Sequence, residues 1–495
     1  MPRKTDNWIS GSIPDNSGYP RSWDASGADS GFIPLFNSDA YGQSVFGPPP
    51  KKRGGPDFGE FRKCAGLSSR ELVTRYPGLF VFPPNPTAET GLSISPDDFI
   101  FRIVEDKNGV ECLQTGNYMG FLGWQGDGEK QVSLTITSRF ARDNYFLFYL
   151  LQKVLNYNVV SWETSADMTT EAIDLLSIMF PRRLEQALQQ GLYREYRFFD
   201  RNDGNLTGEI DISRYVSEDI PFRGSIACRT REFAFDNKVT QLIRHTIEFL
   251  GTRTFFRKFI QSSTSGIAQA VSKITAATDE TYNAFARAKI IALNSRPFSH
   301  PYFSAYRPLV DLCLKILRHD RMAYGDSKND SLQGVLFDGA FLWEEYLWTI
   351  LRKYDTELVH SKNKAGSGGF RPFEGGEYTA NWYPDFYKEG EFVMDAKYKR
   401  LGNGVSASDL HQMVSYMHLL NAKKGILIHP ENTESASFDG NIGTLYNHAD
   451  ETMGRVAFPV PTIEGEETYG EFCNKMKNAE TKLIDRMNAE LRNGF

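Results

Sequence analysis

The stretch YPDFYKEGEFVMDAK, which runs from Tyr383 to Lys397, decides the fold of the C-terminal part of the chain. Its pattern of apolar and polar residues predicts two β-strands joined by a tight turn at Lys388 to Gly390. Because side chains alternate between the two faces of a strand, Asp395 and Lys397 point the same way, and the hairpin brings Asp385 alongside them. Two carboxylates and an ammonium group are therefore expected to converge at one strand end.

This group of side chains has the chemistry needed for phosphodiester hydrolysis. Carboxylate oxygens suit Mg²⁺, which polarises a phosphate and lowers the pKa of an attacking water. The ammonium group of Lys397 would orient that water and steady the developing negative charge. The alternative interpretation is an ordinary solvated ion pair between Asp395 and Lys397 at the end of a strand.

The Asp-x-Lys pattern alone is not specific, because the chain contains three similar matches. They are Asp236-Asn237-Lys238 and, in the Glu form, Glu105-Asp106-Lys107 and Glu480-Thr481-Lys482. Asp236 fits the N-cap of a helix, Asp106 precedes an Asn-Gly turn, and Glu480 lies in a charged terminal helix. Asp395 differs from all three because it ends an apolar strand that follows a Pro-Asp pair.

A third carboxylate is expected from the helix Gly339 to Leu351, where Glu344 and Glu345 are neighbours. At 3.6 residues per turn, Glu345 falls on the polar side of this helix. Glu344 instead shares a face with Phe337, Phe341, Leu347, Trp348 and Leu351. A carboxylate on an apolar face needs a partner, which a metal site would supply. The alternative partner is a buried arginine.

The segment Ser408 to Leu420 predicts a helix after the second strand. Gln412 and Tyr416 lie four residues apart, so both project from one side of this helix toward the strand end that carries Lys397. There they could bind a DNA phosphate or the metal-bound water. The alternative is that Asp409 and Gln412 form a capping box, which would explain Gln412 without any chemistry.

The order of predicted elements gives a multidomain α+β protein. Residues 1–80 form a polar arm rich in Gly and Pro, and residues 81–160 form a β-rich module. Residues 161–330 are mainly helical, with helices at 169–192 (kinked at Pro181), 237–261 and 267–293, and with one strand at 206–212. Residues 331–460 follow the order α-β-β-β-α-β of an α/β domain, and residues 461–495 form a C-terminal helix.

Composition excludes several classes of protein. The chain has 495 residues, a net charge of -6 and five scattered cysteines without a Cys-x-x-Cys pair. A disulfide framework or a zinc ribbon is therefore not indicated. The longest apolar run is far too short for a membrane span, and the polar N-terminus favours the cytoplasm. The net charge argues against bulk attraction to nucleic acid, but it leaves room for a local DNA-binding groove.

The motifs of the last hundred residues resemble the McrC family, the endonuclease subunit of McrBC-type modification-dependent restriction systems, whose nuclease is of the PD-(D/E)xK class. The resemblance rests on Pro384-Asp385, on Asp395-Ala396-Lys397-Tyr398-Lys399, on Asp409-Leu-His-Gln412-x-x-x-Tyr416 and on the strand Gly425 to Pro430. Phe337 to Glu344 is similar to the family's helix that delivers the extra acid. Weaker similarity is found at residues 116–121, 134–136, 206–211 and 235–238.

The resemblance implies a C-terminal PD-(D/E)xK nuclease domain that depends on Mg²⁺. The expected catalytic residues are Asp385, Asp395, Lys397, Glu344, Gln412 and Tyr416. The expected metal-binding residues are Asp385, Asp395, Glu344 and Ala396. The implied substrate is double-stranded DNA, cut in defence against phage and other foreign DNA.

The resemblance also implies an McrB-like AAA+ GTPase ring as partner, bound and stimulated by the N-terminal β-rich module. The chain itself should not hydrolyse nucleotide, because the nearest match to a phosphate-binding loop, at residues 123–130, has Glu129 in place of the required Lys and no following Ser or Thr. Two alternatives remain open. One is a nuclease-dead regulator of an AAA+ NTPase, and the other is a stand-alone RecB-like repair nuclease.

Overall fold

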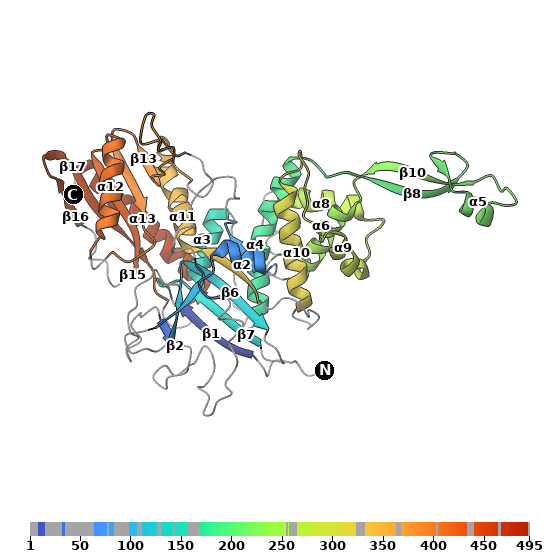
Figure 1. Cartoon of the computed structure of the whole chain (residues 1–495), viewed down its shortest axis with the longest axis horizontal. Helices are drawn as coiled ribbons and strands as arrows, with labels where there is room; N and C mark the ends of the chain where they lie inside the picture. The colour runs from blue at the N-terminus through green and yellow to red at the C-terminus, as the bar shows by residue number, and fades with distance from the viewer. Residues whose placement is uncertain are drawn as a thin grey trace, which may run out of the picture. The chain divides into compact units, whose positions relative to one another are not determined.

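The computed structural model describes residues 8–14, 32–34, 64–76, 79–83, 99–105, 111–125, 131–141, 144–155, 168–253, 256, 265–322, 332–362, 368–401, 404–432, 440–463 and 467–493. The chain divides into two compact units (Figure 1). The main unit comprises Met1–Ala172 and Lys328–Phe495, and the inserted unit comprises Ile173–Ser327. No helix among the described residues is long and apolar enough to cross a membrane.

The first part of the main unit, here called the N-terminal β module, contains two sheets. The larger sheet has the strand order β1 (Trp8–Pro14), β7 (Gln131–Thr137), β6 (Tyr118–Gln125), β11 (Leu332–Asp338) and β3 (Leu79–Phe82). The smaller sheet has the order β2 (Phe32–Pro34), β5 (Glu111–Thr115) and β4 (Phe101–Glu105). A β-rich module was predicted here. The strands β1, β2 and β3 correct the prediction that residues 1–80 form only an arm.

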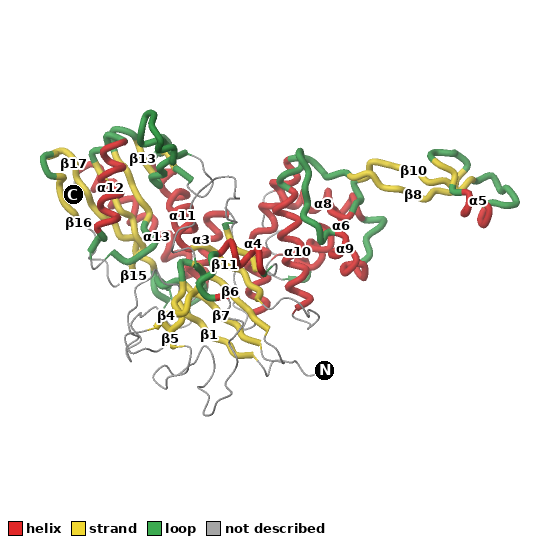
Figure 2. Tube along the Cα trace, in the orientation of Figure 1, coloured by secondary structure: helices red, strands yellow, loops and turns green. Residues whose placement is uncertain are grey.

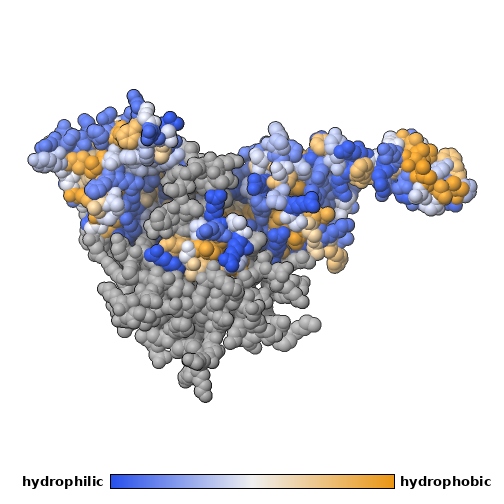
Figure 3. All heavy atoms as spheres, viewed as in Figure 1, coloured by the Kyte–Doolittle hydropathy of each residue, from blue (hydrophilic) through white to orange (hydrophobic). Residues whose placement is uncertain are grey.

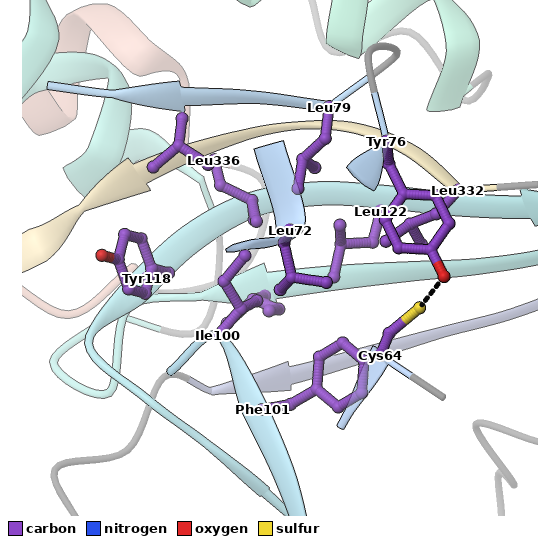
Figure 4. Packing of buried hydrophobic residues seen from close by; sticks show 12 residues of the cluster. Cys64, Leu72, Tyr76, Leu79, Ile100, Phe101, Tyr118, Leu122, Leu332 and Leu336 are labelled. Atoms are coloured by element: carbon purple, nitrogen blue, oxygen red, sulfur yellow. Dashed lines mark hydrogen bonds between the residues drawn. The ribbon is translucent and has the colours of Figure 1, made fainter. Parts of the chain in front are cut away.

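A buried cluster beneath the larger sheet includes residues from the end of that predicted arm (Figure 4). The helix α2 (Ser69–Arg75) contributes Leu72, and the Cys64 thiol lies 3.1 Å from the Tyr76 hydroxyl. Leu122 of β6 and Leu336 of β11 pack into the same cluster. Apolar residues between Cys64 and Phe82 therefore pack in the core. The prediction missed this because the residues before them are rich in Gly and Pro.

The strand β11 links this module to the C-terminal domain. It pairs antiparallel with β6 and parallel with β3, so it belongs to the N-terminal sheet although it follows the inserted unit in sequence. This corrects the placement of residues from 331 onward in the C-terminal domain. The helix α11 (Gly339–Tyr354) begins directly after β11, with Asp338 as its N-cap.

The C-terminal domain is a six-stranded mixed sheet with helices packed on it (Figure 2). The strand order is β12 (Val359–His360), β13 (Phe386–Lys388), β14 (Phe392–Ala396), β15 (Lys424–Asn432), β17 (His448–Val460) and β16 (Gly440–Leu445). The helix α12 (Ala407–Leu419) follows β14, and α13 (Tyr469–Asn493) ends the domain. From α11 to β15 the elements follow the predicted order α-β-β-β-α-β, and two further strands and a helix complete the domain.

The sheet of the C-terminal domain is covered by helices from several parts of the chain. The helix α12 contacts β14 and β15, while α11 contacts β14 and α13 contacts β17. The helix α3 (Tyr145–Leu155) packs on α11 and α13. Glu480 of α13 accepts hydrogen bonds from the hydroxyls of Tyr149 and Tyr346 and from Lys153. The terminal helix is therefore fixed by a polar contact inside an apolar interface.

The inserted unit combines helices with a small sheet. Its helices are α4 (Met168–Gln189, which begins in the main unit and runs through Pro181), α5 (Ile212–Glu218), α6 (Lys238–Gly251), α8 (Ser265–Thr278), α9 (Arg287–Leu293) and α10 (Tyr306–Met322). The sheet has the order β8 (Glu195–Asp203), β10 (Ile226–Ala234) and β9 (Glu209–Ile210). A mainly helical region was predicted. The helix predicted for 267–293 is divided into α8 and α9, and the strands β8 and β10 were missed.

The sheet of the inserted unit and the helix α5 expose many large apolar side chains (Figure 3). Phe198 is 67 % exposed and Ile212 is 72 % exposed. We call this set of exposed residues the apolar patch: Tyr196, Phe198, Leu206, Ile210, Ile212, Val216, Ile220, Phe222 and Phe233. Because β8 and β10 form a ribbon with little covering, these side chains have no core to enter within this sheet.

Candidate active site

The predicted hairpin of residues 383–397 is present and brings two carboxylates together. The strands β13 and β14 pair antiparallel, with Lys388 opposite Phe392 and Phe386 opposite Met394. Gly390 occupies the turn with a φ of +75°, a conformation that glycine adopts without strain. The backbone N–H of Ala396 donates a hydrogen bond of 2.6 Å to Oδ2 of Asp385. Asp385 is thereby held against the end of β14.

Lys397 lies between this strand end and the helix α12. Its Nζ is 2.6 Å from Oδ2 of Asp395 and 3.4 Å from Oδ1 of Asp409, and it donates a hydrogen bond of 2.9 Å to Oε1 of Gln412. Burial favours the neutral amine, but the charges of Asp395 and Asp409 outweigh it and raise the pKa of Lys397. The side chain is therefore a fixed ammonium group at neutral pH.

The helix α12 aims Gln412 and Tyr416 at Lys397, as the four-residue spacing predicted. Gln412 donates through Nε2 to the Tyr416 hydroxyl at 3.1 Å while its Oε1 accepts from Lys397. The N-cap of α12 is Ser406, whose hydroxyl accepts from the backbone N–H of Asp409. The capping-box explanation of Gln412 is therefore wrong, because the cap involves Ser406 and Asp409.

The two glutamates of α11 differ in their neighbours. Glu345 lies 3.4 Å from Nε2 of His360 and 3.3 Å from Nζ of Lys362, and these contacts outweigh burial and lower its pKa. The pKa of Glu344 is instead raised well above its usual range, first by burial and then by the charges of Asp385, Glu345 and Asp395. Glu344 thus belongs electrostatically to the group of carboxylates at the strand end.

The prediction that Glu344 lies on the apolar face of its helix and Glu345 on the polar side is wrong. Phe337 lies in β11 and not in the helix, and the fully buried face of α11 centres on Trp343, Tyr346 and Leu347. The side chains of Glu344 and Glu345 are both partly exposed, at 19 % and 14 %. Periodicity therefore does not separate the two residues, and His360 lies near both, 3.8 Å from Glu344 and 3.4 Å from Glu345. The ion pair with Lys362 distinguishes Glu345.

The strand end carries more negative charge than its neighbours neutralise. The pKa of Asp385 is raised well above its usual range, first by burial and then by the charge of Asp395, which is itself buried. Such a group of carboxylates is costly unless a cation joins it. Mg²⁺ often binds through one or two carboxylates and keeps several waters. The donor set therefore fits that ion, although no three His, Cys, Asp or Glu side chains of the described residues are already arranged to hold one.

Two residues near the site were missed by the sequence analysis. Asp409 is buried and accepts from Lys399 at 2.6 Å, and hydrogen bonds from Lys399 and Ser406 outweigh burial and lower its pKa. His360 places Nδ1 2.9 Å from the backbone carbonyl oxygen of Asp385, beneath the ring of Phe386. Asp409 could have been found as the acid one helical turn before Gln412. No sequence signal marks His360.

The other Asp-x-Lys and Glu-x-Lys matches do not form comparable groups. Asp236 pairs with Arg197 at 2.7 Å, and the N-cap of α6 is Asn237 and not Asp236. Glu480 lies inside α13, as predicted, and bonds to the two tyrosines described above. Asp106 and Lys107 lie outside the described residues, as does the tip of the loop between β6 and β7 that resembled a phosphate-binding loop.

The comparisons with known proteins identify a family. A sequence model described as McrBC 5-methylcytosine restriction system component matches residues 113–430. No curated protein matches the chain.

Two solved structures from Thermococcus gammatolerans are similar to the chain. One is the half-complex of a tetradecameric assembly of McrB AAA+ hexamers with bound McrC, at 13 % identity and a TM-score of 0.41, covering 83 % of this chain and 92 % of that chain. The other is the McrBC complex, at 14 % identity and a TM-score of 0.25, covering 59 % and 81 %. The family match alone spans well over half of the sequence, so the chain belongs to the McrBC 5-methylcytosine restriction system component family.

Proposed function

We propose that this chain is the endonuclease subunit of its McrBC-type system and that it hydrolyses phosphodiester bonds of double-stranded DNA with Mg²⁺. The observation that carries the proposal is the convergence of Asp385 and Asp395 with the ammonium group of Lys397 at one strand end, beside the raised pKa of Glu344. Strongly perturbed pKa values of buried carboxylates cluster at functional sites.

The roles of the chain's own residues follow from their contacts. Asp385, Asp395, Glu344 and the backbone of Ala396 would hold Mg²⁺, which supplies charge to polarise the scissile phosphate and a water of lowered pKa. Lys397 is held by Gln412 and Asp395, so its ammonium group is oriented before DNA arrives. Tyr416 fixes the amide of Gln412 and so limits the rotation of that side chain.

The test compares Asp395→Asn with Asp236→Asn in the full-length chain. Asp236 belongs to a second Asp-x-Lys sequence but pairs with Arg197, so it is a matched control. Cleavage of methylated and unmethylated plasmid DNA is followed as Mg²⁺ is titrated. The proposal predicts that Asp395→Asn abolishes cleavage and that Asp236→Asn cuts as the wild type does. Cleavage by Asp395→Asn at the same rate as by Asp236→Asn would contradict the proposal.

We further propose that cleavage depends on an AAA+ GTPase partner. One similar structure is described as McrC bound to McrB AAA+ hexamers, and the net charge of -6 leaves this chain without strong non-specific affinity for DNA. The family resemblance implies that the partner contact lies in residues 81–160. The apolar patch offers a second candidate surface, because a contiguous group of exposed large apolar side chains often marks an interaction site.

The partner proposal is tested by measuring two activities in the same samples: GTP hydrolysis by an AAA+ protein encoded beside this chain in the genome, and DNA cleavage. Asp395→Asn should keep the stimulation of hydrolysis and lose cleavage. Full cleavage by the isolated chain would favour a stand-alone nuclease. Stimulation of hydrolysis without cleavage under any condition would favour a nuclease-dead regulator.

A further inference from the structure

The N-terminal β module contacts the catalytic strand end at Tyr398, the residue that follows Lys397. Tyr398 is buried, and its hydroxyl lies 2.9 Å from Oγ of Ser138 and donates to Sδ of Met119 at 3.3 Å. Met119 lies in β6, and Ser138 directly follows β7. Two central strands of the module therefore end on the ring of a residue adjacent to the catalytic lysine.

The same end of the module also holds the start of α11. The backbone N–H of Gly339 donates to the carbonyl oxygen of Asn117 at 2.7 Å. A Cβ atom at Gly339 would lie only 2.7 Å from Cε1 of Tyr398 and 3.0 Å from that carbonyl oxygen, so no larger residue fits without movement. The helix that carries Glu344 thus begins in direct contact with Tyr398.

Arg139 links Asn117 to the ring of Tyr398. Its Nη2 donates to Oδ1 of Asn117 at 2.7 Å, and its guanidinium carbon lies 4.8 Å from the centre of the Tyr398 ring. The carbonyl oxygen of Arg139 accepts from Nη2 of Arg400 at 3.0 Å. We call Asn117, Ser138, Arg139, Gly339 and Tyr398 the junction.

The junction connects α11, which carries Glu344, with the end of β14, which carries Asp395 and Lys397. These two elements are far apart in sequence. Lys397 precedes Tyr398 by one residue, and its backbone N–H bonds to the carbonyl oxygen of Ile428 at 2.8 Å. Glu344 follows Gly339 by about one and a half helical turns. Because Gly339 is held by Asn117 and Tyr398 is held by Met119 and Ser138, all in the module, the spacing between α11 and the end of β14 depends on the module.

We propose that the junction positions the catalytic groups, so that the N-terminal β module sets the geometry between Glu344 and the pair of Asp395 and Lys397. Tyr398 is then a positioning residue, and a change in the module on partner binding is transmitted to the cleavage site through it. This inference rests on the proposed nuclease function. A purely structural junction would affect stability and leave the rate and the metal affinity unchanged.

The test uses Tyr398→Phe, Ser138→Ala and the double variant, with Tyr346→Phe as the matched control. Tyr346 also has a buried hydroxyl in a hydrogen bond, to Glu480, but it does not belong to the junction. The measured quantities are kcat and KM for DNA cleavage, the affinity for Mn²⁺ by electron paramagnetic resonance, and the melting temperature. Mn²⁺ stands in for Mg²⁺ as an observable probe.

The inference predicts that Tyr398→Phe and Ser138→Ala each lower kcat about tenfold with little change in KM, because small displacements of catalytic groups are costly. The double variant should be no slower than the worse single variant, since both remove one contact. Mn²⁺ affinity should fall in these variants and stay unchanged in Tyr346→Phe. If Tyr398→Phe cleaves DNA at the wild-type rate and binds Mn²⁺ with the wild-type affinity, the positioning role of the junction is wrong, and the proposed nuclease function is unaffected. A wild-type chain that neither cuts nor binds Mn²⁺ would overturn the proposed nuclease, and this inference with it.

Discussion

The end of β14 and the ribbon of β8 and β10 depart from ordinary protein structure in opposite ways. The first buries charge, since Asp395 is only 4 % exposed beside Asp385. The second exposes apolar side chains, such as Phe198 and Ile212. Both departures cost free energy in the isolated chain, because buried carboxylates lose hydration and exposed rings stay in water. A cation would relieve the first cost, and a protein partner would relieve the second.

The difference separates the two proposed activities by region. Chemistry on a phosphate needs a few charged groups held in fixed positions. Association with another protein needs apolar area surrounded by polar residues. Because the two features lie in different compact units, variants of the strand end should change cleavage and leave partner stimulation intact.

The largest effect is expected at the strand end. Lys397→Ala, Asp385→Ala and Asp395→Ala should each reduce cleavage by about 10³-fold or more, because each removes a charge that acts on the developing transition state. Partner stimulation should remain at the wild-type level. The measurement is single-turnover cleavage of plasmid DNA with the partner and GTP present. Loss of stimulation in these variants would show that the two activities are not separable by region.

A smaller effect is expected at α11. Glu344→Gln should raise the Mg²⁺ concentration needed for half-maximal cleavage by about 10- to 100-fold, as is usual for groups that support a metal site. Glu345→Gln should change it little, because Glu345 already pairs with Lys362 and contacts His360. Mg²⁺ titrations of both variants decide the matter. Similar shifts in the two would mean that the carboxylate of Glu344 has no special role.

Substitutions in the apolar patch are expected to reduce the stimulation of GTP hydrolysis by the partner. Phe198→Asp and Ile212→Asp should weaken stimulation of the partner by about 30-fold, the loss typical of a central interface residue. Phe285→Asp is the control, because Phe285 is 97 % exposed in the same unit but lies outside the patch. Cleavage by high concentrations of the complex should be retained. If Phe285→Asp and Phe198→Asp behave alike, the patch is not the contact surface.

The smallest expected effect concerns stability and pH. The pKa of Asp385 is raised in the folded chain, so folding favours its protonated form. Its ionisation therefore destabilises the fold, and this loss of stability appears as pH rises above the unfolded pKa toward the raised folded pKa. Without metal, Asp385→Asn should have a melting temperature a few degrees above that of wild type at pH 8, and the difference should shrink at pH 4. Calorimetry in EDTA tests this, and added Mg²⁺ should stabilise wild type only.

The sequence was sufficient to predict features that depend on neighbouring residues. The hairpin that joins Asp385 to Asp395 and the helix that carries Gln412 and Tyr416 are local, and their periodicities are clear. The roles of Asp409 and His360 depend on contacts across the fold, and only Asp409, one helical turn before Gln412, had a signal in the sequence. The strands β8 and β10 were missed because their large apolar residues Tyr196, Phe198 and Phe233 face solvent, so the apolar pattern does not mark a buried face.

The position of β11 in its sheet has a consequence for synthesis of the protein. The strand lies between β6 and β3, yet about 250 residues separate Phe82, at the end of β3, from Leu332. At the usual elongation speed of about 5–20 residues per second, β3 waits roughly 12–50 s on the ribosome for this partner. The hairpin of β13 and β14 is translated only after that. A chain terminated before Leu332 therefore has neither a completed N-terminal sheet nor the hairpin that brings Asp385 to Asp395.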